Sequence, residues 1–293
     1  MQPEDYPTLF QESDRLAVIA QRKQFVLVRL QILFLLVVTF LLAVPWRFFP
    51  DLSTFSAFTV AFILASLTVL TVVSQNGRYD KVWGNCRAIA ESIKTESWLF
   101  MMRAPPYAAT NEAVTAQTLF LDRIAELLRL HESGASHLAL ELKEGPQITD
   151  TMEKVYQMDL LSRRDYYVKN RIRDQKVWYA SKAKWNRARG FQWFSLAWLL
   201  QIGATGAAIL VIVVKDTWID PVGIAVGAVV GVLSWLNSRS YNEPAESYGI
   251  VAQELVLLQD RATRANTEES FAKVVVETEG AIMREQKIWL ARI

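Results

Sequence analysis

The stretch from residue 163 to residue 189 holds the densest group of side chains capable of binding or chemistry. It contains ten basic residues against two acidic ones, interleaved with five aromatic residues. Basic and aromatic side chains together bind nucleic acids or nucleotides through phosphate contacts and base stacking. They equally bind anionic lipid headgroups beside a membrane. We favour a simpler interpretation, a positively charged flank of a membrane span whose aromatic residues pack inside a helical bundle, and we expect no nucleic acid partner.

Four basic residues at the end of this stretch directly precede an uncharged apolar segment at 191–214. These residues are candidates for a basic vestibule or for contact with anionic lipid: Lys182, Lys184, Arg187 and Arg189. The C-terminal stretch 242–285 has the opposite character, with nine acidic residues against four basic ones. We therefore predict that the basic and acidic helices lie side by side and neutralise each other, within one chain or between subunits.

Polar and small residues inside the apolar segments are the other candidates for function. Gln201 and Thr205 lie one helical turn apart, and a mid-membrane amide requires a partner or water. An interhelical hydrogen bond is the favoured role, with pore lining as the alternative. Gly223, Gly227 and Gly231 recur every fourth residue, a spacing that lets helices approach closely in lipid. Packing inside a hairpin is the favoured role there, with packing between subunits as the alternative.

Catalytic and metal-binding patterns are not found in the sequence. It has one cysteine, Cys86, and two histidines, His131 and His137, which are six residues apart and therefore not on one helical face. No P-loop, GxSxG or HExxH motif occurs. We expect no enzyme activity, no catalytic residue, no metal site and no cofactor.

Four apolar segments must position these residues. The segments 30–46, 56–74, 191–214 and 222–237 contain no charged residue, and a helix of about 20 apolar residues crosses a bilayer. Strand patterns are lacking. The sequence therefore predicts an all-α integral membrane protein with four transmembrane helices, at about 25–46, 56–75, 191–214 and 221–237. With 52% apolar and 21% charged residues, the remainder is expected to form a bundle of long cytoplasmic helices.

The two pairs of spans define an internal repeat. Each half reads as a long helix, a hairpin of two spans and a second long helix, so the repeat is parallel. We predict one unit at 1–110, a cytoplasmic linker helix at 111–147, a second unit at 148–265 and a C-terminal cytoplasmic helix at 266–293. Residues 148–190 are predicted to form one unbroken helix. A helix is expected to restart after Asn266-Thr267, with acidic residues in its first turn.

The charge around the hairpins predicts the topology. The bases of the hairpins are rich in lysine and arginine, whereas the return loops are nearly neutral, with Arg47 against Asp51 and Lys215 against Asp216 and Asp220. Cytoplasmic loops carry the excess of basic residues. Both termini and the soluble body are therefore expected on the cytoplasmic side.

Diffuse helical patterns give the chain a resemblance to a known family. One set of residues follows the second span and another precedes the third: Trp83, Ala90, Glu91, Lys94, Trp98, Pro106 and Tyr107, then Arg173, Gln175, Trp178, Tyr179 and Asn186. With these residues the chain resembles the SLATT membrane proteins, in the bacterial form with two SLATT units, over about residues 5–265. The resemblance implies a bacterial inner-membrane protein that forms a pore or perturbs the membrane in a conflict system.

The sequence thus favours a homo-oligomeric channel or pore-forming effector in the lipid bilayer, conducting ions between several copies of the chain. Two hairpins in one chain enclose too little space for a hydrated lumen, so a pore requires an oligomer. The alternative is a non-conducting membrane-anchored scaffold whose cytoplasmic helices recruit partners. A small-solute transporter is less favoured, because the spans offer little beyond Gln201 to build a binding site.

Overall fold

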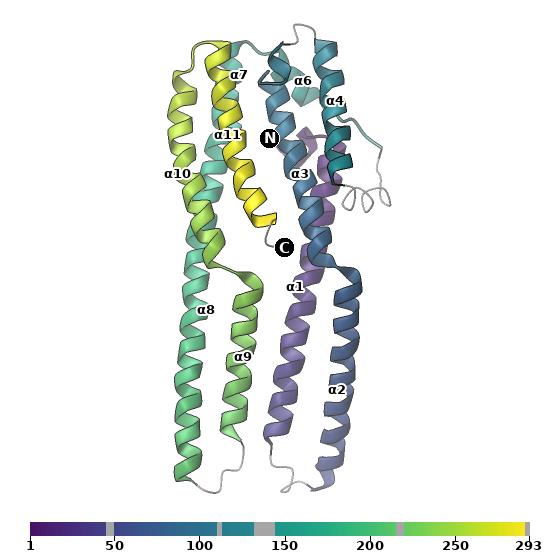
Figure 1. Ribbon diagram of the computed structural model, residues 1–293, viewed down its shortest axis with the longest axis vertical. Coiled ribbons are helices and arrows are strands. Elements are labelled where there is room, and N and C mark those ends of the chain that lie inside the picture. The colour runs from purple at the N-terminus through teal and green to yellow at the C-terminus, as the bar shows by residue number, and fades with distance from the viewer. Residues whose placement is uncertain (45–49, 110–112, 132–143, 215–219, 291–293) are drawn as a thin grey trace. The chain divides into compact units, whose positions relative to one another are not determined.

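The computed structural model describes residues 1–44, 50–109, 113–131, 144–214 and 220–290, and within these ranges the chain is helical with no strand (Figure 1). The prediction of an all-α fold is confirmed for this part of the chain. The longer helices are α1 (Thr8–Ala43), α2 (Pro50–Gly77), α3 (Tyr79–Met101), α4 (Ala113–Leu130), α6 (Asp150–Gln157), α7 (Leu160–Tyr167), α8 (Arg173–Val213), α9 (Pro221–Arg239), α10 (Asn242–Arg264) and α11 (Glu268–Leu290). A π-helical turn, Val168–Ile172, joins α7 to α8, and short 3-10 turns occupy Pro3–Asp5 and Tyr107–Ala109.

The chain divides into two compact units. The helical body comprises Met1–Gln21, Tyr79–Ala183 and Glu246–Ile293, and the hairpin unit comprises Arg22–Arg78 and Lys184–Ala245. Three helices, α1, α8 and α10, contribute residues to both units. The expected continuation of the helices before the first and third spans into those spans is therefore confirmed.

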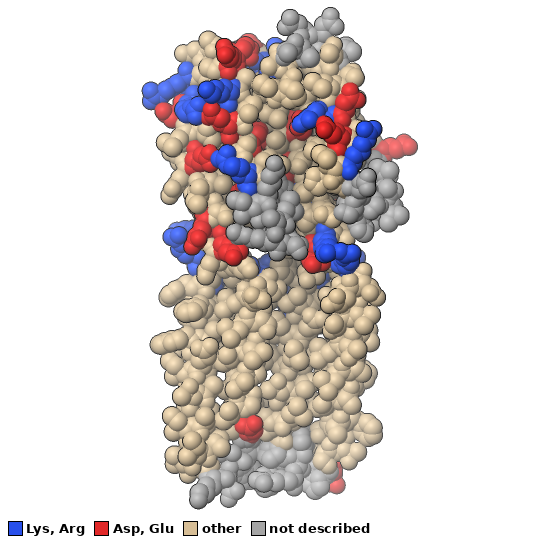
Figure 2. Space-filling view, in the orientation of Figure 1, with Lys and Arg blue, Asp and Glu red and all other residues tan. Residues whose placement is uncertain are grey.

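The hairpin unit contains the four predicted spans. Four helices of the described chain are long and apolar enough to cross a membrane, and within the unit α1 runs antiparallel to α2 and α8 antiparallel to α9 (Figure 1). On the face drawn in Figure 2, charged residues gather on the helical body, and the surface of the hairpin unit is almost free of them. The residues at its surface are large and apolar, such as Phe58, Phe62 and Ile212. This surface suits hydrocarbon and not water.

The second helix of each hairpin is followed by a residue with a positive φ angle. Arg78, directly after α2, and Ser240, directly after α9, have positive φ values of 39° and 43°. A left-handed residue at this position ends a helix, because its amide turns back to bond a carbonyl of the last turn. The Arg78 amide donates to Ser74 and the Ser240 amide donates to Leu236. The two halves of the chain therefore leave their second spans in the same way.

The core of the helical body forms around α3, which packs against α4, α6 and α11. Small residues of α3, including Gly84, Ala88 and Ala90, are buried and allow neighbouring helices to approach. Aromatic rings fill the rest of the core: Phe100 stacks on Tyr156 with centroids 4.9 Å apart and lies 5.2 Å from Phe120. Such pairs stabilise a core beyond their buried area alone.

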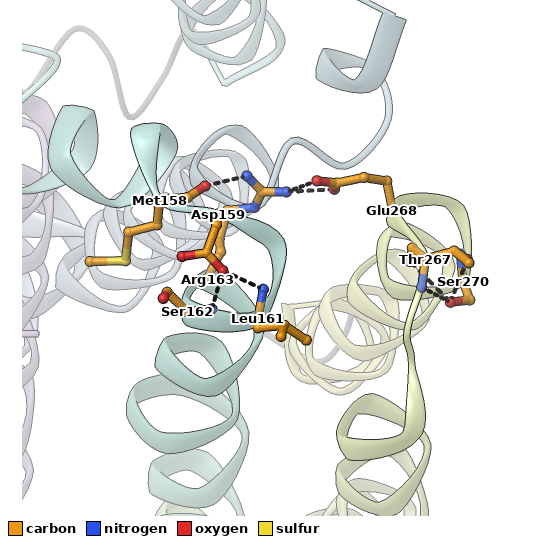
Figure 3. Close-up of polar contacts among 8 residues, drawn as sticks. All are labelled: Met158, Asp159, Leu161, Ser162, Arg163, Thr267, Glu268 and Ser270. Atoms are coloured by element: carbon orange, nitrogen blue, oxygen red, sulfur yellow. Dashed lines mark hydrogen bonds and ion pairs between the residues drawn. The ribbon is translucent and has the colours of Figure 1, made fainter.

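The prediction of one unbroken helix from 148 to 190 is wrong. The chain leaves α6 through Met158 and Asp159, both in extended conformation, before α7 begins. The Asp159 carboxylate accepts hydrogen bonds from the amides of Leu161 and Ser162 (Figure 3). Such a side chain satisfies the first free amides of a helix and fixes its start. Helical structure then continues without interruption from Leu160 to Val213.

The predicted restart after Asn266-Thr267 is confirmed. Helix α10 ends at Arg264, and α11 begins at Glu268 with Glu268 and Glu269 in its first turn. The Thr267 hydroxyl accepts from the Ser270 amide at 3.2 Å. The two helix starts are joined by Arg163, whose guanidinium donates to Glu268 and to the carbonyl of Met158 (Figure 3).

A second ion pair, between the π-helical turn and α11, is fully buried. Arg171 donates to both carboxylate oxygens of Glu279, through Nε at 2.9 Å and Nη2 at 2.6 Å. Tyr167 and Thr95 donate their hydroxyls to the same carboxylate. Burial alone would lower the pKa of Arg171, but the Glu279 carboxylate raises it, and the guanidinium stays charged. The expected pairing of the basic and acidic helices is thus confirmed for Arg163 and Arg171.

We predict that Glu279→Gln lowers the stability of the helical body by about 3–5 kcal/mol, because it leaves a buried guanidinium without its countercharge. Asp260→Asn is the matched control, since it removes an exposed partner of Arg264 and should cost about 0–1 kcal/mol. The thermal midpoint of the purified protein in detergent checks both variants. Equal midpoints for Glu279→Gln and the unaltered protein would contradict this account of the core.

Candidate functional site

Two of the three regularly spaced glycines lie against α1, within the same chain. A Cβ atom added at Gly227 would lie 2.5 Å from Cγ2 of Thr39, and one at Gly231 would lie 3.4 Å from side-chain atoms of Ile32 and Leu36. Glycine therefore permits close approach of α9 to α1, the first span of the other hairpin. Helix α8, the partner of α9 in its own hairpin, provides none of these nearest atoms.

The remaining small residues have different surroundings. A Cβ atom at Gly223 would meet the Asp220 carboxylate, which caps α9 by accepting from the amides of Val222 and Gly223. Gly203 and Gly206 of α8 meet nothing within 4 Å in the described chain. Only part of the small-residue pattern therefore serves packing within one chain.

The threonine hydroxyl groups of the spans form hydrogen bonds within their own helices. Every threonine of the four predicted spans donates its hydroxyl to the carbonyl four residues earlier in its own helix, at 2.8–3.1 Å: Thr39, Thr59, Thr68, Thr71 and Thr205. For Thr205 that carbonyl belongs to Gln201. The threonine hydroxyls therefore place no demand on lipid or on a neighbouring helix.

Gln201 is different, because its side chain lies on the exposed surface of the hairpin unit. Its amide has no hydrogen-bond partner among the residues that the structure describes. Gln201 and Thr205 thus meet only through the backbone carbonyl of Gln201. Among the described residues, the Gln201 side chain does not form the interhelical hydrogen bond that the sequence favoured. Sequence reasoning missed a second amide, Gln31 on α1, which is half-buried and likewise unpaired in the described chain. Gln31 stands near the start of its span, two residues after Arg29.

The basic stretch separates into buried and exposed parts. Arg163 and Arg171 are 0% and 1% exposed and are paired with carboxylates. The four residues predicted to face a vestibule or lipid are all exposed on α8: Lys182, Lys184, Arg187 and Arg189. Lys182 lies 5.9 Å from the ring centroid of Trp178, and Arg189 donates to Gln192 and lies over Trp185. All four side chains are therefore accessible on the surface of α8.

A cluster of charges between α1 and α3 could not be anticipated from spacing. Arg87 bonds Asp14 and Glu91, each at 2.5 Å. Burial would raise the pKa of Glu91, but Arg87, Lys94 and Arg171 lower it below its usual value, so the carboxylate stays ionised. Arg87 is therefore held in ion pairs with Asp14 and Glu91.

The remaining candidates for chemistry are the cysteine and the two histidines. Cys86 is buried, and burial raises the pKa of its thiol to about 11. The ring of His131 lies 3.0 Å from the carbonyl of Leu127, and His137 lies outside the described residues. Within the described ranges, no group of three histidine, cysteine, aspartate or glutamate side chains is arranged to hold a metal ion.

Comparison with protein families gives two matches in tandem. Residues 7–164 match a family described as "SMODS and SLOG-associating 2TM effector domain 3", SLATT_3. Residues 167–289 match "SMODS and SLOG-associating 2TM effector domain 1", SLATT_1. Each match contains one pair of predicted spans, α1 with α2 and α8 with α9. No curated protein and no solved structure matches the chain.

We predict that Gly227→Ala destabilises the hairpin unit, because its new methyl group overlaps Thr39, and overpacking of this kind costs about 1–3 kcal/mol. Gly203→Ala is the matched control: the same substitution in a span, at a position with open space. The thermal midpoint in detergent should fall for Gly227→Ala and hold or rise for Gly203→Ala. The reverse order would show that α9 does not pack on α1 through this glycine.

Proposed function

Because the chain belongs to the SLATT family, with two two-helix membrane effector domains in tandem, we propose that it acts as a homo-oligomeric pore-forming effector. Its four transmembrane helices make it a multi-pass membrane protein. We place it in the bacterial inner membrane, with both termini and the helical body in the cytoplasm, as the distribution of basic residues favours. The conflict-system role implied by the family suits such an activity.

One observation carries the proposal: a glutamine stands in the middle of a span without a partner in the described part of the chain. Gln201 is exposed, and its amide is unpaired among the described residues. An amide left in hydrocarbon is costly, so it is expected to face another protein surface or water. Assembly of several chains around an axis gives Gln201 either environment, and in a pore it would line the wall one turn from Thr205.

The charged residues beside the spans support conduction of ions. Lys184, Arg187 and Arg189 are exposed on α8 directly before the third span. Basic residues at the mouth of a pore raise the local concentration of anions. Glu268 and Glu279 are paired with Arg163 and Arg171, and Glu254, Asp260 and Glu277 are paired with arginines of the C-terminal helices themselves. None of these five carboxylates neutralises the three cations. The proposed activity requires no catalytic residue and no cofactor.

A different observation favours the scaffold as a second candidate. Ile250 and Leu257 stand two turns apart on one face of α10 in the helical body, and they are 65% and 68% exposed. Apolar side chains at the surface of a domain outside the membrane often mark a protein contact. A scaffold would recruit partners through this face and conduct nothing.

We predict that Gln201→Leu lowers ion flux through proteoliposomes by about tenfold, because an apolar ring at that level would dewet the pore. The change should leave the oligomer intact, as judged by its size in detergent. Ser66→Ala is the control, since the Ser66 hydroxyl already donates to Phe62 of its own helix. Ser66→Ala should conduct like the unaltered protein.

The scaffold makes the opposite prediction for the same experiment. The unaltered protein would give no flux above that of empty liposomes, and Gln201→Leu would change nothing. Replacement of Ile250 and Leu257 by serine would then abolish function in cells while the protein still reached the membrane. That pair of results would reject the pore and favour the scaffold.

A further inference from the structure

A pocket of about 450 Å³ lies inside the hairpin unit, between α1, α8 and α9. Its walls are mostly apolar and include Ile32, Leu36, Trp193, Gly231 and Trp235. Leu33 also lines the pocket and is 53% exposed, so the pocket opens on the outer surface of the unit. Its volume is typical of sites for small ligands. In a bilayer this opening meets lipid or another span, and its occupant must be largely apolar.

Two polar groups at the pocket lack partners. The guanidinium of Arg29 lies 5.4 Å from the centroid of the Trp235 ring and forms no ion pair within the described part of the chain. The indole Nε1 of Trp235 is buried and has no hydrogen-bond partner among the described residues. A buried donor left without an acceptor is costly. The indole nitrogen is closed off by protein atoms, whereas Arg29 is exposed at the pocket and its charge is open to an anionic ligand.

A second cation stands beside the same ring. The guanidinium of Arg239 lies 5.4 Å from the Trp235 centroid and 4.0 Å from that of Phe25. Its Nε is also buried without a partner. Two cations flanking one indole repel each other unless an anion lies near both. A negative group between these two guanidinium groups would be attracted by both of them.

We propose that this pocket binds an anionic phospholipid. One acyl chain lies in the apolar part beside Gly231, and the phosphate accepts hydrogen bonds from the guanidinium groups of Arg29 and Arg239, which flank the Trp235 ring. Tryptophan and arginine near the end of a span stand at headgroup level, where such a phosphate lies. The four predicted spans contain no carboxylate, so a span of a second copy cannot supply the anion. The proposal holds whether or not the chain conducts ions.

Native mass spectrometry of the delipidated full-length protein tests the site, by titration with phosphatidylglycerol and with phosphatidylcholine of the same acyl chains. The unaltered protein should prefer phosphatidylglycerol. Arg29→Gln should weaken that binding by about tenfold, the effect of one lost charge-assisted contact, and leave phosphatidylcholine binding unchanged. Arg22→Gln is the control, because it removes an exposed cation of the same unit that does not line the pocket.

Several results would overturn the proposal. Equal binding of the two lipids by the unaltered protein would do so, as would an equal loss in Arg29→Gln and Arg22→Gln, which indicates nonspecific attraction. Dissociation of an oligomer by Arg29→Gln with lipid binding intact would assign the pocket to a second copy instead. If Arg29→Gln fails to fold, Arg239→Gln decides, since it removes the second cation beside the Trp235 ring; unchanged preference for phosphatidylglycerol in that variant would reject the site.

Discussion

The absence of water from the bilayer interior is the constraint on which the hairpin unit depends. Every polar group there needs a partner, and the threonines of the spans find one in their own helices, at the carbonyl four residues earlier. A polar side chain that finds no hydrogen-bond partner in the described chain is a place where another molecule is expected to supply one. Gln201 at mid-span is such a place in the described chain, and the proposal for function starts from it. The proposal for lipid binding starts from Arg29 and Arg239 beside the pocket.

The helical body satisfies its polar groups in another way. Its basic and acidic helices bury Arg171 and Glu279 together, and the hydroxyls of Tyr167 and Thr95 complete the set. Arg163 joins two helix starts through Glu268 (Figure 3). Buried pairs of this kind contribute little net stability, but they are costly to break. They therefore fix the register of the helices more than they strengthen the fold.

The sequence predicted the features that depend on local composition. The four apolar segments, the helix restart at Thr267 and the continuity of α8 into the third span follow from hydropathy and capping residues. It did not predict the break at Asp159, because one aspartate inside a long polar helix pattern is a weak stop signal. It could not show that Gly227 and Gly231 lie against α1 instead of α8, nor which cations of the basic stretch are buried. Those facts depend on contacts between helices far apart in the sequence.

Assembly is the central claim, because a pore exists only between several copies of this chain. Electron microscopy of the purified protein in nanodiscs tests it most directly, through averaged views along the membrane normal. The account predicts a ring of several subunits with an opening on its axis and the helical bodies on one side of the membrane. A monomer or a compact dimer without an axial opening would contradict it and would turn attention to what the helical body binds.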